Sequence, residues 1–221
     1  MKKRISKNFY IQPTLKVAKE LLGKYLVRKI GKEKFVGKIV ETEAYIGPKD
    51  KASHAYRWKM TERNRVEYLE GGRIYIYLCY GMHWQLNFTT QKQGKPECVL
   101  IRALEPILKY KNLKEIKNLT NGPGKLCRWL KLDKSFNGED LIKSKKIWLE
   151  DRGDKMNPSP PQAAGYPVAN GTSSFGPIKR GAEIKKSQIK AARRIGIDYA
   201  GSWAKKPWRF YLKNSTFVSV R

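Results

Sequence analysis

Two stretches decide the fold, Lys38–Tyr56 (KIVETEAYIGPKDKASHAY) and Arg73–Phe88 (RIYIYLCYGMHWQLNF). The first has the composition of a strand up to Tyr45, and it places a carboxylate, Glu43, two residues before that aromatic side chain. Because side chains alternate between the two faces of a strand, both residues are expected to leave the same face of a sheet. This stretch therefore predicts an acid next to an aromatic ring.

The second stretch predicts a β-hairpin. Aliphatic and aromatic side chains alternate from Arg73 to Tyr80, Gly81 then turns the chain, and the return arm runs from Trp84 to Thr90. Tyr80 is therefore expected at the tip. A tip with Tyr, Met, His and Trp side chains would be a poor solvent-facing turn, so a purely structural role leaves its apolar character unexplained.

The remaining pattern predicts an α+β fold with a mainly antiparallel sheet, because strands and helices follow one another in mixed order. The 221 residues, of which 40% are hydrophobic, suffice for a single domain over residues 1–221. A Pro, Gly and Ser-rich stretch at 157–181 is expected to be a surface excursion. Helices are predicted at 13–22, 61–69, 125–132, 187–197 and in the polar segment that contains Tyr110 and Leu113; strands are predicted at 24–30, 35–45, 73–80, 84–90, 99–104, 147–150, 208–212 and 217–220.

The charge of the chain points to a polyanionic partner. Lys and Arg number 47 against 19 Asp and Glu, which gives a formal net charge of +28. Such a charge repels itself unless a polyanion binds it, so we expect nucleic acid as the partner. Selection for a lysine-rich, soluble chain explains part of the excess, but acidic residues would normally rise with it.

Cysteine and histidine usage predicts neither disulfides nor a metal site. The three cysteines, Cys79, Cys98 and Cys127, lack any CxxC spacing, and the two histidines, His54 and His83, have no metal-ligand spacing. No window of the chain approaches the roughly 20 apolar residues that a membrane span needs. We therefore expect an intracellular protein without cofactors or membrane contact.

Several separated motifs, in register over most of the chain, carry a resemblance to a known family. The sequence resembles the 3-methyladenine (alkyladenine) DNA glycosylases in the runs IVETEAYIGPKDKASH, TERNR, YIYLCYGMHWQLN, VLIRALEP, GPGKLC, KSFNGEDL, IWLEDRG, AARRIGIDYAGSWAKKPWRFY and FVSV. The segment 157–181 departs from the family pattern, because it is longer and richer in proline than expected between IWLE and AARRIGI.

The resemblance implies a monofunctional, cofactor-free and monomeric enzyme of base excision repair, with a curved sheet and a hairpin that inserts into DNA. Its partner would be double-stranded DNA that contains damaged purines such as 3-methyladenine, 7-methylguanine, hypoxanthine or ethenoadenine. The enzyme would flip the damaged nucleotide out of the duplex and hydrolyse the N-glycosidic bond. The compartment would be the cytoplasm or nucleoid of a prokaryote, or the nucleus of a eukaryote.

The resemblance also assigns the catalytic residues. Glu43 matches the family's catalytic glutamate, since a carboxylate beside C1′ stabilises positive charge on the sugar and takes a proton from water. Arg102 matches an arginine that orients this carboxylate and keeps it ionised. Without the resemblance, Glu43 would equally be a surface glutamate on a strand. The motifs assign no general acid, which neutral purines would need.

The same resemblance also implies which residues form the base pocket and which residue excludes guanine from it. Tyr45 and Tyr77 match pocket tyrosines, and His54 is the third wall, because a flipped base needs flat surfaces to stack on. Ordinary core packing is the alternative for the tyrosines and the expected role of Tyr75, and a loop histidine bonded to backbone is the alternative for His54. Asn87 matches the residue that rejects the amino group of guanine; its alternative is a solvent-facing polar residue.

The hairpin tip would fill the space that the flipped base leaves. Tyr80, with Met82 beside it, matches the family's intercalating tyrosine, which wedges between base steps in the minor groove. A non-enzymatic basic nucleic-acid-binding protein would share the charge of this chain but not the acidic Glu43 within a basic face. A bifunctional glycosylase that uses a lysine Schiff base is disfavoured, because the matched site residues include no lysine.

Overall fold

The long strand β3 (Glu33–Tyr45) is the centre of the sheet. The computed structural model describes residues 3–107, 118–152 and 184–221. Along one edge, β3 pairs first with β2 (Tyr25–Ile30) and then, at Glu41–Glu43, with β9 (Arg209–Leu212). Along the other edge it pairs with β6 (Glu97–Pro106). The carboxyl end of β3 therefore lies between strands from distant parts of the sequence.

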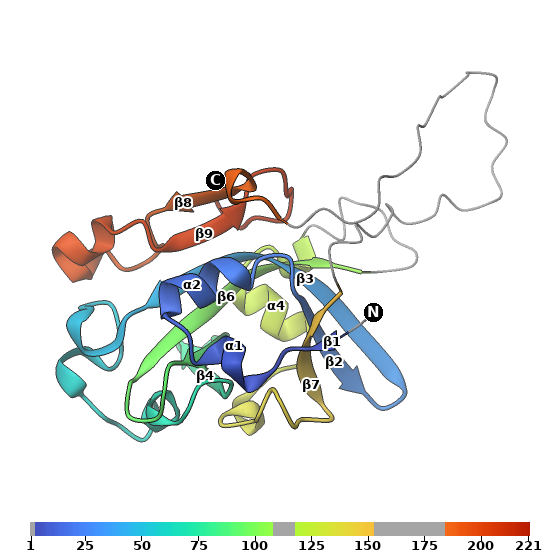
Figure 1. Ribbon diagram of the computed structural model, residues 1–221, viewed down its shortest axis with the longest axis horizontal. Coiled ribbons are helices and arrows are strands. Elements are labelled where there is room, and N and C mark those ends of the chain that lie inside the picture. Colours follow the sequence, from blue (N-terminus) through green and yellow to red (C-terminus); the bar gives the residue numbers. More distant parts are fainter. Residues whose placement is uncertain (1–2, 108–117, 153–183) are drawn as a thin grey trace, which may run out of the picture.

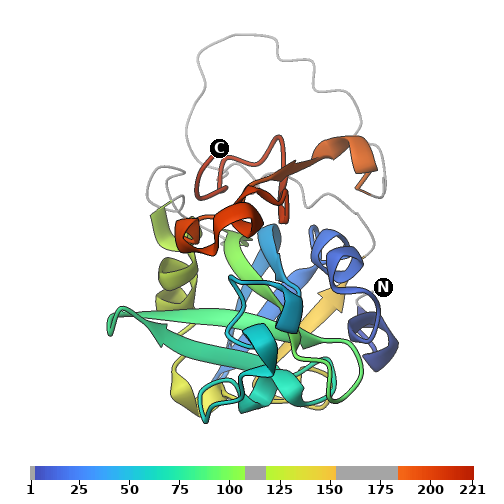
Figure 2. The same ribbon diagram turned by 90° about the vertical axis from the view of Figure 1, so that its left-hand side faces the viewer.

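The strands form one sheet in which every pair is antiparallel. Its order is β1–β7–β2–β3–β6–β5–β4, and β9 extends it with β8. The remaining strands are β1 (Lys3–Arg4), β4 (Ile74–Cys79), β5 (His83–Thr90), β7 (Ile147–Asp151) and β8 (Ile189–Ala192). In both ribbon views the β8–β9 ribbon lies over one side of the rest (Figures 1 and 2). The predicted α+β class with a mainly antiparallel sheet is confirmed.

Short helices complete the described part of the chain. Its α-helices include α1 (Lys7–Tyr10), α2 (Thr14–Glu20) and α4 (Pro123–Trp129). The 3₁₀ turns are η1 (Gly47–Lys49), η2 (Tyr56–Trp58), η3 (Arg65–Tyr68), η4 (Lys134–Phe136), η5 (Lys186–Gln188) and η6 (Asp198–Lys205).

Helix α2 packs on the sheet through a stripe with helical spacing. Val17, Ala18 and Leu21 are fully buried, while Lys16 and Glu20 form an i,i+4 pair on the outer side. The chain leaves the helix through Gly23, whose φ of 85° suits glycine. The helix predicted at 13–22 is confirmed.

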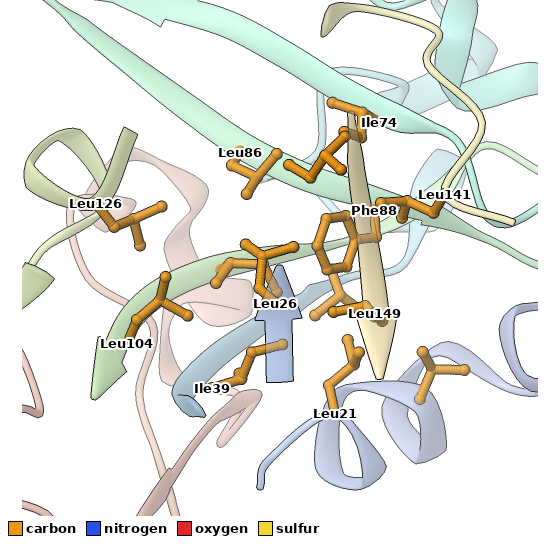
Figure 3. Packing of buried hydrophobic residues seen from close by; sticks show 14 of the residues in the cluster. Leu21, Leu26, Ile39, Ile74, Leu86, Phe88, Leu104, Leu126, Leu141 and Leu149 are labelled. Atoms are coloured by element: carbon orange, nitrogen blue, oxygen red, sulfur yellow. The ribbon is translucent and has the colours of Figure 1, made fainter. Parts of the chain in front are cut away.

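One large hydrophobic cluster joins the sheet to α2 and α4. Its side chains come from β2 to β7 as well as from both helices, among them Leu26, Ile39, Phe88, Leu104 and Leu126 (Figure 3). Burying one such side chain stabilises the fold by roughly 1.5–3 kcal/mol. The cluster fixes β3, β4, β5 and β6, the strands that carry Glu43, Tyr45, Tyr77, Asn87 and Arg102.

The predicted hairpin is confirmed as β4 and β5, with Tyr80 at its tip. The hairpin projects from the body of the molecule (Figure 2). Tyr80 and Gly81 both have positive φ, at 51° and 69°, as tight hairpin turns require. At the start of the return arm, next to the tip, α4 lies so close that a Cβ on Gly124 would stand 3.0 Å from His83. Glycine thus allows the helix to hold the hairpin.

Three local predictions were wrong. The segment 187–197 is not a helix but continues from η5 into β8, whose residues pair with β9. Residues 217–220 form no strand, although Phe217 and Val218 are buried. Only a single 3₁₀ turn, η3, lies within 61–69. Pairing with β9 outweighed the helix propensity of this segment, which is rich in Lys, Arg and Ala. The predictions for Tyr110, Leu113 and 157–181 lie outside the described residues.

Candidate active site

A cleft beside the hairpin continues into a narrow pocket, and the two share Tyr45, Ala52, His54 and Tyr77. The outer cleft has a volume of about 570 Å³. It is also lined by Arg63, Leu78, Cys79, Tyr80, Gly81, Gln85, Leu100, Arg102, Pro123, Ile195, Gly196, Ile197 and Tyr199. The inner pocket adds Glu67, Tyr75, Asn87 and Cys98.

Glu43 lies next to this cleft as a fully buried carboxyl group near the end of β3. One oxygen, Oε2, accepts a hydrogen bond of 2.8 Å from the Tyr45 hydroxyl. The other, Oε1, accepts one of 2.9 Å from the backbone N–H of Ile195 and lies 3.3 Å from Nη1 of Arg102. The predicted shared face of Glu43 and Tyr45 is confirmed, while a surface position for Glu43 is excluded.

Burial raises the pKa of Glu43 above its ordinary value, although Arg102, the Ile195 N–H and Tyr45 each lower it. Arg102 lowers the pKa of Glu43, as expected of its cationic partner, but the effect of burial is larger. A carboxyl group with a raised pKa accepts a proton more readily than an ordinary one, which suits a general base.

Arg102 connects Glu43 to a second buried carboxylate on β3. Its Nε lies 3.4 Å from Glu41 Oε1, and that oxygen also lies 2.8 Å from Nη1 of Arg209. The other Glu41 oxygen accepts a 2.7 Å bond from the Ser219 N–H. The register of β3 against β6 shifts beside Glu41, near Arg102. This network fixes the arginine from the side away from Glu43.

Tyr45 is held by a second buried ion pair. Arg194 forms two hydrogen bonds with Asp50, at 2.5 and 2.9 Å, and both side chains are inaccessible to solvent. Its guanidinium lies 4.7 Å from the Tyr45 ring centroid and 5.1 Å from that of Trp208. The extended backbone after β8 thus places Arg194 behind Tyr45 and the Ile195 N–H at Glu43.

His54, Tyr75 and Tyr77 form an aromatic wall. The His54 ring meets Tyr77 edge-on, with ring centroids 4.6 Å apart, and its Nδ1 lies 2.7 Å from the Tyr75 hydroxyl. Burial and, to a smaller extent, the nearby charge of Arg63 lower the pKa of His54 to about 4, so the imidazole is neutral at physiological pH. The histidine is thus bonded to a side chain and not to backbone. Tyr75 is buried as predicted, but it also lines the inner pocket.

Asn87 lies at the inner pocket with a fixed amide. Its NH₂ group donates to the carbonyls of Tyr75 and Gln85, at 3.2 and 3.1 Å, and it is 2% exposed. Because both donated bonds are satisfied by backbone, Oδ1 is the side of the amide left for other partners, and the Cys98 thiol lies 3.8 Å from it. A solvent-facing position is excluded.

The hairpin tip differs from the buried polar site, because its large apolar side chains are exposed to solvent. Tyr80 is 84% exposed and Met82 is 70% exposed, and across the cleft mouth Tyr199 is 73% exposed. Tyr80 and Tyr199 both line the outer cleft. An exposed apolar cluster beside a cleft indicates a binding surface.

The structure brings Glu43, Arg102, Tyr45, His54, Tyr77 and Asn87 together around the two cavities, with Tyr80 at the mouth and Met82 beside it on the tip. Sequence reasoning missed Glu67, Cys98, Arg63 and Tyr199, and it gave Tyr75 only a packing role. Arg63 lies inside the quoted run TERNR, but its position over the Tyr77 ring, at 5.9 Å, depends on tertiary folding. No local pattern marks these residues.

The described residues contain neither a candidate metal cluster nor a candidate membrane-spanning helix. Within residues 3–107, 118–152 and 184–221, His, Cys, Asp and Glu side chains form no group of three or more that could hold a metal ion. The helices in the same part of the chain include none with the length and apolar character that a membrane span needs.

Comparison with known proteins gives consistent matches. The family model described as methylpurine-DNA glycosylase (MPG) matches residues 8–167. A relative from Natranaerobius thermophilus that carries the provisional name 3-methyladenine DNA glycosylase is 39% identical over 98% of this chain and 99% of its own. A similarly named protein from Methanocella arvoryzae is 41% identical over 98% and 96%. The DNA-3-methyladenine glycosylase of Mus musculus is 36% identical over 98% of this chain and 61% of its own length.

Proposed function

The chain belongs to the methylpurine-DNA glycosylase family, and we propose that it releases alkylated and deaminated purines from double-stranded DNA by hydrolysis of the N-glycosidic bond. The observation that carries this proposal is Glu43, a buried carboxyl group fixed by two hydrogen-bond donors and an ion pair with Arg102 beside a cleft with aromatic walls. A protein that only bound nucleic acid would have no use for an acid in that position, since it repels phosphate.

Glu43 acts on the sugar and on water. As the glycosidic bond breaks, positive charge develops at C1′, and a carboxylate beside it stabilises the transition state. The same group takes a proton from the attacking water. Arg102 and the Ile195 N–H hold Oε1, so the carboxylate is positioned before the substrate arrives. Rigid placement of this kind lowers the barrier by removing motions that the reaction would otherwise have to freeze.

The aromatic wall receives the flipped base. Tyr45 and Tyr77 supply ring faces, and neutral His54 packs against Tyr77 without adding a charge that would repel a cationic alkylpurine. Stacking on an aromatic side chain contributes roughly 1–3 kcal/mol per base. Asn87 lies deeper and crowds the amino group of guanine, which hypoxanthine lacks.

The tip of the hairpin stabilises the opened duplex. Tyr80 enters the stack where the damaged nucleotide was, and Met82 contacts the neighbouring step, because a rigid apolar wedge fills a gap that water would otherwise occupy. The basic surface attracts the phosphates, so binding weakens steeply as salt rises. The protein acts as a monomer on this substrate.

Substitution of Glu43 tests the proposal. Glu43→Gln is expected to bind duplexes that carry hypoxanthine or alkylated purines while base release, measured as alkali-labile sites, falls by two or more orders of magnitude. Gln preserves the shape and one acceptor of the group, so the fold is retained. Undiminished release would remove Glu43 from the mechanism. Binding by the unmodified protein without any release would leave only a nucleic-acid-binding function.

A further inference from the structure

Glu67 is a buried carboxyl group that the proposed mechanism does not use. It lies in the turn η3, is 1% exposed and lines the inner pocket. Its Oε1 accepts a 3.2 Å hydrogen bond from the Cys98 thiol, and the Asn64 amide lies close enough to lower the pKa of the carboxyl group, whereas Oε2 is buried without a hydrogen bond of ordinary geometry among the described residues. Buried polar atoms are normally paired, so an unpaired oxygen beside a ligand pocket indicates that the ligand completes the site.

The groups that face Glu67 carry no charge at neutral pH. They are the phenols of Tyr68, Tyr75 and Tyr77, the Cys98 thiol, the neutral imidazole of His54 and the amides of Asn64 and Asn87. Burial raises the pKa of Glu67 to about 8. Arg63, over the Tyr77 ring, belongs to the outer cleft and not to this pocket. At pH 7 Glu67 is therefore mostly a carboxylic acid, with one O–H donor and one carbonyl acceptor.

The position of the pocket decides which part of a purine reaches Glu67. The outer cleft is lined by Arg102 and Ile195, the partners of Glu43, whereas Glu67, Asn87 and Cys98 line the inner end. The glycosidic nitrogen N9 must lie at Glu43, and the edge of a purine that is farthest from N9 carries N1 and the substituent on C6. That edge therefore points toward the inner pocket.

We propose that Glu67 is a specificity-determining residue, whose carboxyl group pairs through two hydrogen bonds with the N1/C6 edge of the flipped purine. This inference rests on the proposed function. Hypoxanthine offers an N1–H donor beside the O6 acceptor, and 3-methyladenine offers the N6 amino donor beside the N1 acceptor. A carboxylic acid matches either order, because its O–H and C=O can exchange places. An ionised carboxylate has no donor and loses one of the two bonds.

Two substitutions separate this pairing from a packing role. Leu at position 67 removes both hydrogen bonds, whereas Gln keeps one donor and one acceptor but cannot ionise. Glu67→Leu is expected to lower kcat/KM for hypoxanthine about tenfold or more. Release of ethenoadenine should fall less, because the etheno bridge removes the N–H donor from this edge. Glu20→Gln, on the outer side of α2, is the control for a lost carboxylate.

The pH profile supplies the second measurement. In the unmodified protein the hypoxanthine rate should fall as pH rises from 7 to 9, since Glu67 loses its donor. In Glu67→Gln the ratio of the rates at pH 9 and pH 7 should be several times higher. Equal ratios in both proteins would overturn the proposal, even if Glu67→Leu failed to fold.

The outcomes also separate this inference from the proposed function. If the unmodified protein released no damaged purine, the proposed function itself would fail. If it released both bases, and Glu67→Leu kept the same ratio of hypoxanthine to ethenoadenine, only the pairing would be overturned. A uniform loss for both bases would assign Glu67 to the packing of the pocket.

Discussion

The two ends of the β4–β5 hairpin invert the usual distribution of side chains in opposite ways. At its tip Tyr80 and Met82 are exposed to solvent. At its other end and on the neighbouring strands, Asn87, Glu43 and Arg102 are buried. A folded protein normally buries the first kind and exposes the second. Both arrangements cost free energy, and in the proposed complex DNA would cover the tip and a base would fill the pocket.

This contrast between the two ends indicates which residues should serve binding alone and which should also serve the stability of the fold. Exposed apolar groups at the tip contribute little to folding, because they contact little of the protein, so their loss should affect binding alone. The buried charges are coupled to one another, so the loss of a cation among them should affect folding as well as catalysis. The hairpin thus connects an exposed tip, where substitutions should leave the stability of the fold unchanged, with a buried region, where they should not.

Removal of Arg102 should have the largest effect on stability. Arg102→Met leaves Glu43 without its cation and removes one of two cations from Glu41, so the free energy of unfolding should fall by about 3–5 kcal/mol. Chemical denaturation measures this change. The control is Arg73→Met, whose partly exposed pair with Asp140 should contribute less than about 1 kcal/mol. Equal losses in the two variants would show that burial adds nothing to the Arg102 network.

The ion pairs around Arg102 could not be predicted from the sequence, although other features of the site could. The antiparallel strands, the tip residue and the pairing of Glu43 with Tyr45 followed from alternation, which is a local property of the chain. Glu41 lies on the same strand as Glu43, yet nothing local distinguishes a carboxylate that faces two arginines from one that faces water. Its partners, Arg102 and Arg209, come from other strands and become neighbours only when the sheet forms.

The structure of the segment around Arg194 also could not be predicted from the sequence, because its local propensity favoured a different structure. Lysine and arginine suggested a helix at 187–197, because charged residues are common on helices. In the structure, pairing of β8 with β9 extends the backbone, which places Arg194 on Asp50 and the Ile195 N–H on Glu43. The site therefore depends on a tertiary contact that outweighs local propensity. The Glu67 carboxyl was missed for the same reason, since its burial depends on β4, β5 and β6.

The second effect in size is the pH dependence that Glu67 gives to stability. The pKa of Glu67 is about 8 in the folded protein and lies near 4.5 when the chain unfolds. A raised folded-state pKa means that the associated stability is complete below pH 4.5 and is lost as pH rises toward 8. Between pH 6 and pH 8 the free energy of unfolding should fall by about 2–3 kcal/mol more than in Glu67→Gln.

Denaturation at several pH values measures this difference. The control is Glu70→Gln, at an exposed glutamate paired with Lys7, whose profile should run parallel to that of the unmodified protein. If Glu67→Gln also ran parallel, Glu67 would titrate like an ordinary carboxyl group.

The third effect belongs to the exposed end of the hairpin. Tyr80→Ser should change the free energy of unfolding by less than about 0.5 kcal/mol, because the ring is 84% exposed. Binding to a lesion duplex should weaken about tenfold, or about 1.4 kcal/mol, since the wedge is lost. Binding to DNA in which the base is already extruded should weaken less. Equal weakening on both substrates would contradict insertion into the stack.

The smallest expected effect is the change in stability on substitution of the buried Glu43. Burial raises the pKa of Glu43, so the ionised carboxylate opposes folding at pH values above its pKa. Glu43→Gln should therefore keep or slightly raise stability at pH 8, by up to about 1 kcal/mol, while it abolishes base release. The amide oxygen can accept from Ile195, and the amide nitrogen can donate to the Tyr45 hydroxyl, so no donor is left facing another donor.

Glu41→Gln is the matched comparison, because Glu41 is equally buried two residues away on β3. Its carboxylate lies 2.8 Å from Arg209 and accepts the Ser219 N–H, so the neutral amide would leave a buried arginine less well paired and lower the stability. Thermal unfolding of both variants at pH 8 measures the sign of the change in stability for each. Opposite signs would mean that Glu41 is kept for the fold and Glu43 for the reaction, whereas equal destabilisation would make Glu43 as structural as its neighbour.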